Sequence, residues 1–382
     1  MMTKEIVVIV KNKLMSITTI LPILIELKEK YNVSSTIIVN DKLAHKGINE
    51  NVVIRDAVDY VGTELYTEPN SSNKIIRKFL KIKLLFFLLF KLIKGTKVLH
   101  FGIFNVFPFS VLGGLFGKNL YFFQSSSFKH SFERFDALSN RTPSIATPIG
   151  RNIVAFNDAF RYLNVVRESQ RVFMFGSTRT RVSWKNYINQ RSDDYFNKYH
   201  GNVDLANGCI VIMLSSFEEL RHMRLPNEGL TILFKRTIEV LDKIKGDISV
   251  FLKPHVFTDI NIVNKAIHGR NGFYMTYLHQ SVLASKAKVF ICNSYSSTMA
   301  DAKSLGVRTI EYSDYNNDIL KLSEGKSMGY EYVDDFINND KGEFEKLIKS
   351  ILFTDSPSKN RPVAEDIKTD ADKLLTILAE SN

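Results

Sequence analysis

The first half of the chain alternates continuous apolar runs with segments of helical periodicity. The apolar runs lack the every-second-residue polarity of a sheet with one wet face, so they favour a parallel sheet covered on both faces. A helical pattern from Ile17 to Tyr31 separates the first two runs. The strand-like runs lie at 4–10, 34–40, 51–61, 97–104 and 118–126.

The same alternation returns in the second half, after a stretch of weaker periodicity at 127–207. That stretch still contains a helix candidate at 152–166 and a strand candidate at 171–177. Regular strand-like runs follow at 209–216, 247–255, 287–297 and 308–314. Helical patterns lie between them at 230–245 and 298–305.

Strands alternating with helices in two blocks predict two doubly wound α/β domains, which a length of 382 residues accommodates. We expect the first domain at 1–190 and the second at 205–345. A last helical pattern within 362–382 is expected to cross back to the first domain.

The composition is that of a folded globular protein, with 45% apolar and 24% charged residues. The two cysteines, Cys209 and Cys292, lie in apolar runs and cannot form the disulfide framework of a small secreted domain, which favours a reduced compartment. The longest uninterrupted apolar run, 84–90, is far shorter than the about 20 residues that cross a bilayer. A membrane-spanning helix is therefore not expected.

The net charge of +11 is concentrated in one part of the chain, because no Asp or Glu lies between Glu68 and Glu133. Segment 73–95 has a helical pattern, and its first basic residues share one face: Lys74, Arg77, Lys78 and Lys81. Such a helix can lie on an anionic membrane surface, where each lysine contributes about 1 kcal/mol. The alternative is a crossover helix with solvated lysines. No nucleic-acid-binding motif accompanies the charge, so nucleic acid is not expected as a partner.

Polar and basic residues follow three strand-like runs of the second half, where the carboxyl ends of parallel strands gather ligand-binding loops. They are Ser215 and Ser216, then Lys253 and His255, then Ser296, Ser297 and Thr298. The last three precede a predicted helix, where hydroxyls and backbone N–H groups together bind anions. A cation and an imidazole beside them suit a phosphate leaving group. Each feature alone has a plainer explanation, namely an ordinary helix cap or a structural histidine.

Segment 209–315, with its motifs LKPH and AKVFICNSYSSTMADAKSLGVRTIEYSD, resembles the nucleotide-binding domain of GT-B glycosyltransferases. It is most similar to bacterial capsule and lipopolysaccharide enzymes that use CMP-activated sugars, such as sialyl-, polysialyl- and Kdo-transferases. Their His-Pro motif is His255-Val256 here. The related CDP-glycerol polymer transferases carry a similar hydroxyl-rich segment.

The resemblance implies that Lys253, His255, Ser296, Ser297 and Thr298 contact the donor phosphate and that Ser215 and Ser216 line the cleft between domains. Asp301 would contact the ribose, or would simply be an acid in a first helical turn, which the helix dipole favours. His255 would also take part in catalysis.

An inverting transferase also needs a carboxylate that deprotonates the acceptor hydroxyl. The acidic-acidic-Gly motif that supplies it in similar sialyltransferases does not occur in the first half of this chain. Position alone suggests four candidates for the base: Glu64, Glu133, Asp136 and Asp158. No metal-binding or dinucleotide motif is present, so neither a metal nor another cofactor is expected, and the nucleotide-activated donor would be a substrate.

These observations predict an α/β protein of the GT-B type, with two Rossmann-like domains. The predicted function is a metal-independent glycosyltransferase of bacterial surface polysaccharide biosynthesis, cytoplasmic and peripheral at the inner face of the cytoplasmic membrane. It would move a sugar, with an acidic sugar from CMP as the first choice, to a glycan or lipid-linked acceptor. The alternatives are a CDP-glycerol-type glycerophosphotransferase, a UDP-sugar 2-epimerase of the same fold and a membrane-associated scaffold without catalysis.

Overall fold

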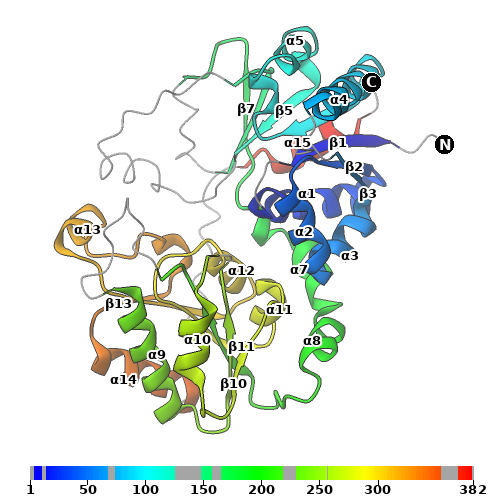
Figure 1. Cartoon of the computed structure of the whole chain (residues 1–382). Coiled ribbons are helices and arrows are strands. Elements are labelled where there is room, and N and C mark those ends of the chain that lie inside the picture. Colours follow the sequence, from blue (N-terminus) through cyan, green and yellow to red (C-terminus); the bar gives the residue numbers. More distant parts are fainter. Residues whose placement is uncertain are drawn as a thin grey trace. The chain divides into compact units, whose positions relative to one another are not determined.

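The computed structural model describes residues 4–10, 14–67, 74–124, 148–156, 165–217, 229–255, 257–353 and 369–380. The chain forms two compact units, each built around one sheet (Figure 1). Unit 1 comprises Met1–Lys129, Ser144–Asn186 and Glu365–Asn382, and unit 2 comprises His130–Pro143 and Tyr187–Ala364. In the middle of the chain the boundary between the two units lies between residues 186 and 187. The sequence suggested residue 190 as the end of the first domain.

Unit 1 holds a seven-stranded parallel sheet in the order β3-β2-β1-β4-β5-β6-β7. Its strands are β1 (Glu5–Val10), β2 (Ser34–Val39), β3 (Gly62–Tyr66), β4 (Lys97–His100), β5 (Leu120–Phe123), β6 (Asn152–Ala155) and β7 (Arg171–Met174). The chain starts in the middle of the sheet, builds one side and then the other, which is the doubly wound order.

The helices of unit 1 are α1 (Leu14–Tyr31), α2 (Lys42–Glu50), α3 (Val52–Val61), α4 (Lys74–Ile93), α5 (Phe109–Leu115), α7 (Val182–Asn189), which runs into unit 2, and α15 (Ala371–Ala379). Short 3-10 turns lie at η1 (Ile103–Asn105), η2 (Gly117–Asn119) and η4 (Thr178–Thr180). One apolar core joins the inner face of α4 to α5 and to strands β1, β2, β4 and β5. Burying each of its large side chains stabilises the fold by about 1.5–3 kcal/mol.

The expectation of a strand at 51–61 is wrong, because this segment forms helix α3. Its buried residues recur at helical spacing: Val53, Ile54, Ala57, Val58 and Val61. The strand β3 starts only at Gly62, where an added Cβ would lie 1.8 Å from the carbonyl oxygen of Ser35 on β2. Glycine therefore permits the close approach of these two strands.

The helix candidate at 152–166 is also wrong at its start, because 152–155 form strand β6 between β5 and β7. All four residues of β6 are buried. Asn152 satisfies its buried amide by donating to the carbonyl oxygens of Lys118 and Leu120, at 2.8 and 3.1 Å. Residues 157–164 lie outside the described ranges.

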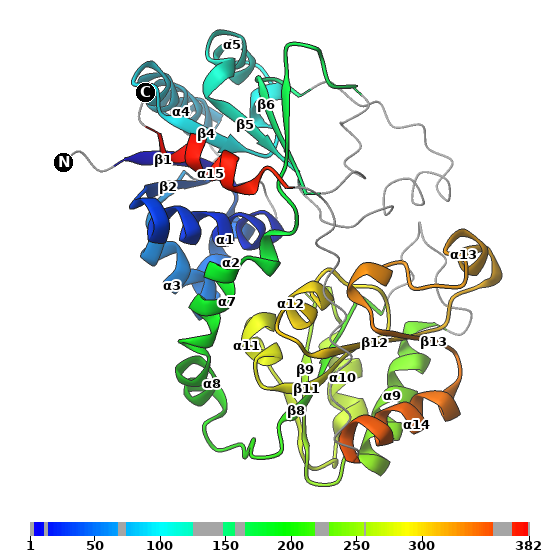
Figure 2. The same ribbon diagram turned by 180° about the vertical axis from the view of Figure 1, so that it is seen from behind.

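The C-terminal helix α15 packs against α1 and β7 of unit 1 (Figure 2). The Asp370 N–H donates to the carbonyl oxygen of Met174 at 2.6 Å, and the hydroxyls of Tyr31 and Thr376 lie 3.3 Å apart. Helix α15 is therefore part of the same unit as β1 and α1.

Unit 2 holds a six-stranded parallel sheet in the order β10-β9-β8-β11-β12-β13. Its strands are β8 (Cys209–Met213), β9 (Ser249–Lys253), β10 (Phe273–Met275), β11 (Ala287–Cys292), β12 (Arg308–Ser313) and β13 (Asp335–Asn338). Its helices are α8 (Ser192–His200), α9 (Leu230–Ile244), α10 (Ile260–Ile267), α11 (Gln280–Ala284), α12 (Met299–Ser304), α13 (Asn317–Leu322) and α14 (Lys341–Phe353), with the 3-10 turn η5 (Tyr330–Tyr332). The order is again doubly wound.

Candidate functional site

Three loops meet at one edge of the sheet of unit 2. They follow β9, β8 and β11, which are neighbours in the sheet and run parallel, so their carboxyl ends lie side by side. The loops carry the residues that the sequence selected: Lys253 and His255, Ser215 and Ser216, and Ser296, Ser297 and Thr298. In a doubly wound sheet this edge, at the point where the strand order reverses, is where ligands bind.

The loops after β8 and β9 are joined through Thr258. Its hydroxyl accepts the His255 N–H at 2.8 Å and donates to the carbonyl oxygen of Ser215 at 2.9 Å. One strand position earlier, the Leu214 N–H donates to the carbonyl oxygen of Lys253 at 3.0 Å. The backbone around His255 is therefore held in place, as a side chain that must meet a ligand requires.

The His255 imidazole presents Nε2 as its donor. Its Nδ1 accepts the N–H of Phe257 at 3.4 Å, so in the neutral ring the proton sits on Nε2. Burial and the neighbouring Lys253 lower the pKa of His255, which favours this neutral form. At neutral pH the side chain can thus donate one hydrogen bond to a phosphate oxygen.

Lys253 supplies the positive charge of this edge. It is the last residue of β9, and its Nζ donates to the carbonyl oxygen of Tyr277 at 3.3 Å. Burial lowers the pKa of Lys253 to about 8, so most molecules carry the charge at neutral pH. A partly desolvated ammonium group interacts more strongly with an anion than one in bulk water does.

The hydroxyls before α12 are paired with each other. Ser296 Oγ and Thr298 Oγ1 lie 2.8 Å apart, and the Thr298 N–H points to Ser296 Oγ at 3.4 Å. Thr298, at the N-cap position, makes no side-chain hydrogen bond to the helix and so does not act as an ordinary helix cap. With Ser297 they form a half-buried cluster of hydroxyls at the loop surface.

Asp301 points away from this loop. The residue is 2% exposed, and its carboxylate accepts hydrogen bonds from the Ser281 hydroxyl at 2.8 Å and the Gln280 amide at 3.4 Å, both on α11. The structure thus gives Asp301 a packing role between α11 and α12.

Glu311 on β12 is a buried carboxylate that sequence reasoning did not select. It accepts hydrogen bonds from the Tyr315 hydroxyl at 2.6 Å, from the Ser327 hydroxyl and from the backbone of Tyr295. Burial raises its pKa to about 7, although these donors oppose the rise. An acidic residue between apolar neighbours in RTIEYSD is the one signal in the sequence that points to it.

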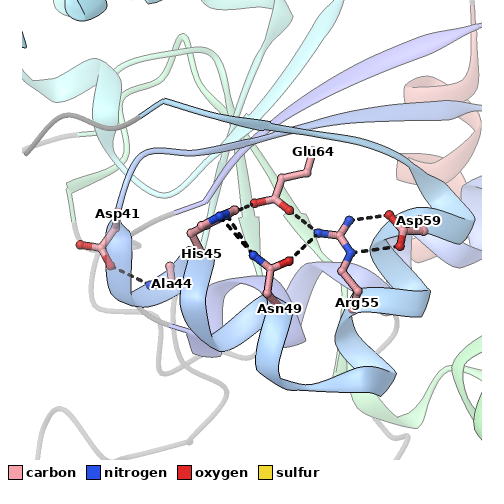
Figure 3. A network of polar contacts seen from close by, with 7 residues as sticks. All are labelled: Asp41, Ala44, His45, Asn49, Arg55, Asp59 and Glu64. Atoms are coloured by element: carbon pink, nitrogen blue, oxygen red, sulfur yellow. Dashed lines mark hydrogen bonds and ion pairs between the residues drawn. The ribbon is translucent and has the colours of Figure 1, made fainter. Parts of the chain in front are cut away.

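Of the four base candidates, Glu133, Asp136 and Asp158 lie outside the described residues. Glu64 is described, and both of its oxygens are engaged (Figure 3): one with His45 Nδ1 at 2.6 Å and the other with Arg55. Asn49 bridges these two partners, donating to His45 and accepting from Arg55 at 3.2 Å. With a side chain only 8% exposed, Glu64 ties α2 and α3 to the edge strand β3.

Among the described residues no three His, Cys, Asp or Glu side chains cluster in a way that could hold a metal ion. Both cysteines are buried, and burial raises the pKa of the Cys209 thiol to about 12, which leaves it unreactive.

No family model and no curated protein matches the sequence. The fold does match solved structures. The UDP-GlcNAc 2-epimerase of Neisseria meningitidis, bound to UDP-GlcNAc, aligns over 100% of this chain and 95% of its own, with a TM-score of 0.58 and 11% identity. UGT2 of Phytolacca americana, complexed with UDP-2-fluoro-glucose and pterostilbene, aligns over 99% of both chains, with a TM-score of 0.52 and 10% identity.

A third match is CalG4, the calicheamicin glycosyltransferase, which aligns over 100% of this chain and 99% of its own, with a TM-score of 0.50 and 10% identity. At such identities the likeness concerns the fold. It confirms the expectation of a GT-B architecture with two parallel-sheet α/β units.

Proposed function

We propose that the protein is a glycosyltransferase that binds a nucleotide-activated sugar in unit 2. The observation that carries the proposal is the meeting of Lys253, His255 and the Ser296–Thr298 hydroxyls at the ligand-binding edge of a GT-B sheet. A glycan or lipid-linked acceptor, and a role in bacterial surface polysaccharide assembly, follow from the resemblance of segment 209–315. CMP is the leading nucleotide for the same reason, while matched structures such as the Neisseria epimerase hold UDP ligands.

In this reaction an acceptor hydroxyl attacks the anomeric carbon of the sugar, and the nucleotide leaves with the electrons of the broken bond. Negative charge develops on the departing phosphate. The Lys253 ammonium, the His255 Nε2–H and the loop hydroxyls are the donors that stabilise it. The proton of the acceptor goes to a base, for which Glu133, Asp136 and Asp158 remain the candidates.

Thermal unfolding with CMP, CDP, UDP, GDP and ADP tests this proposal. A nucleotide at about 100 times its Kd should stabilise the protein by about 2.7 kcal/mol, and His255→Ala should remove most of that shift. His268→Ala is the matched control. This histidine is exposed and follows α10, which carries the chain from the carboxyl end of β9 back to the opposite edge of the sheet.

A shift with a cytidine nucleotide alone would support the CMP donor, and product analysis would then separate sugar transfer from glycerophosphate transfer. A shift with UDP would move the donor to a UDP-sugar, and turnover without acceptor would identify an epimerase. If no nucleotide changes the unfolding temperature, or if both histidine variants respond alike, the assignment of the site fails.

The outer face of α4 supports a second part of the proposal, an anionic membrane surface as partner. Along this face large apolar side chains recur at helical spacing and are 51–66% exposed: Phe79, Ile82, Phe86, Phe90 and Ile93. The opposite face, with Leu84, Leu88 and Leu92, is buried in the core. Within the described chain, no helix is long and apolar enough to cross a membrane.

Helix α5 shares a core with α4 and lies beside it in both views (Figures 1 and 2), and exposed apolar side chains occur on and next to α5 as well. Leu115, on α5, is 71% exposed, and Phe107, two residues before α5, is 80% exposed. Lys78, Lys81 and Lys83 lie exposed on α4, whereas the side chains of Lys74 and Arg77 are outside the described part of the structure. Apolar side chains flanked by lysines, in a segment without carboxylates, complement an anionic lipid surface.

Binding to lipid vesicles tests this surface. Wild-type protein should bind phosphatidylglycerol vesicles better than phosphatidylcholine vesicles. Lys78→Ala with Lys81→Ala should weaken binding to the anionic vesicles about 30-fold, since each lysine contributes about 1 kcal/mol. Phe86→Ser with Phe90→Ser should weaken binding to both. The control is Lys265→Ala with Lys321→Ala, two exposed lysines of unit 2. Equal loss in the control, or no preference for anionic lipid, would contradict the proposal.

A further inference from the structure

Glu311 lies directly beneath the hydroxyl-rich loop. Its Cα pairs with that of Cys292, the last residue of β11, and the loop starts at the next residue. The side chain is completely buried. Burying a carboxylate destabilises the fold unless hydrogen-bond donors satisfy its oxygens. The donors to Glu311 therefore show which segments this side chain connects.

The donors to Glu311 come from three separate segments. Tyr315 and Ser327 donate their hydroxyls, the Ser313 hydroxyl on β12 adds a further contact, and Tyr295, within the loop, donates its backbone N–H. The two hydroxyls in turn accept backbone N–H groups, Tyr315 from Met328 at 3.2 Å and Ser327 from Gly329 at 2.9 Å. One carboxylate thus connects the loop to the segments at 315 and 327–329.

Further contacts fix the start of the loop against β12. The Asn293 side-chain amide donates to the backbone carbonyl oxygen of Tyr312 at 3.0 Å. The Ser313 hydroxyl donates to the backbone carbonyl oxygen of Asn293 at 3.3 Å. The Tyr295 ring packs on the apolar cluster around Tyr315. From 293 to 295 the loop is therefore anchored, and Glu311 holds the last anchored residue before Ser296.

We propose that Glu311 is a positioning residue of the donor site, which sets the place of the Ser296, Ser297 and Thr298 hydroxyls through the Tyr295 N–H. The assignment of a phosphate ligand to these hydroxyls rests on the proposed function, whereas the anchoring of the loop does not. A glutamine at 311 keeps the shape of the side chain but offers one acceptor oxygen in place of two, so a donor loses its partner.

Amide hydrogen exchange of the ligand-free protein tests the anchoring. In Glu311→Gln, amides at 293–300 should exchange at least tenfold faster, while amides of α9 keep their rates. Tyr315→Phe, which removes one donor, should show a smaller increase and serves if Glu311→Gln does not fold. Glu239→Gln, an exposed glutamate of α9 paired with Lys341, is the matched control. Unchanged exchange at 293–300 in the folded variants would overturn the proposal.

Nucleotide affinity tests the link to the site. With CMP, CDP and UDP as probes, Glu311→Gln should weaken nucleotide binding at least tenfold. The substitution should change the affinity for the nucleosides cytidine and uridine much less, because the loop contacts the phosphate that nucleosides lack. A general loss of structure would weaken nucleotide and nucleoside alike, and equal weakening overturns the positioning role. If exchange rises but wild-type protein binds none of the nucleotides, the anchoring stands and the proposed function fails.

Discussion

The free energy of unfolding of the wild-type protein should fall by about 3 kcal/mol as the pH rises from about 5 to about 8, and in Glu311→Gln this fall should be absent. Burial raises the pKa of Glu311 from its ordinary 4.5 to about 7. Between these two values the unfolded chain has released the proton and the folded protein still holds it. Stability therefore falls as the pH rises through this window and levels off above it. A glutamine carries no charge in either state.

Urea unfolding at pH 5 and pH 8, followed by circular dichroism, measures the difference, with Trp184 fluorescence reporting unit 1 separately because this single tryptophan lies there. Of the groups around Glu311, burial raises the pKa values of Tyr295, Tyr315 and Cys292, so none of them titrates in this window. In the described chain no Lys, Arg or His pairs with Glu311. An equal pH dependence in wild type and variant would contradict the prediction.

The sequence predicts the buried strands of the fold well and its edges poorly. Runs such as 4–10 and 209–216 could only be strands of a covered sheet, and the structure confirms them as β1 and β8. The edge strand β3 reads GTELY, has no fully buried residue and lacks an apolar run. The neighbouring helix α3, richer in valine, therefore attracted the strand assignment, although its apolar residues recur at helical spacing.

The site residues that could be predicted are those whose position follows from strand ends alone. Lys253 and His255 stand directly after an apolar run, and parallel strands bring such positions to one edge. Thr258 and Glu311 could not be found in this way, because their role depends on partners far away in the sequence, such as Ser215 and Ser327. The contacts of Asp301 could not be predicted for the same reason, since its partners lie on α11, a five-residue helix without a sequence signal.

Glu26→Leu should destabilise unit 1 by about 3 kcal/mol, because it leaves a largely buried arginine without its main partner. Glu26, on α1, has a side chain 3% exposed and accepts two hydrogen bonds from Arg181, at 2.7 and 2.6 Å. Burial alone would raise the pKa of Glu26, but the hydrogen bonds from Arg181 and Lys30 outweigh it and lower the pKa. This part of the stability is present above pH 4.5 and is lost as the pH falls below it.

Arg181→Leu should cost less, because Lys30 still pairs with Glu26 at 2.6 Å. The double variant should be more stable than Glu26→Leu alone, since two apolar side chains avoid the desolvation of both charges. Trp184 fluorescence in urea follows the transition, as this buried residue lies three positions after Arg181. The control is Glu239→Leu, which breaks an exposed pair with Lys341 and should cost no more than about 1 kcal/mol. If the double variant is no more stable than Glu26→Leu, the pair does more than neutralise two buried charges. The paired side chains would then also hold α1 to the chain before α7, with a geometry that two leucines cannot reproduce.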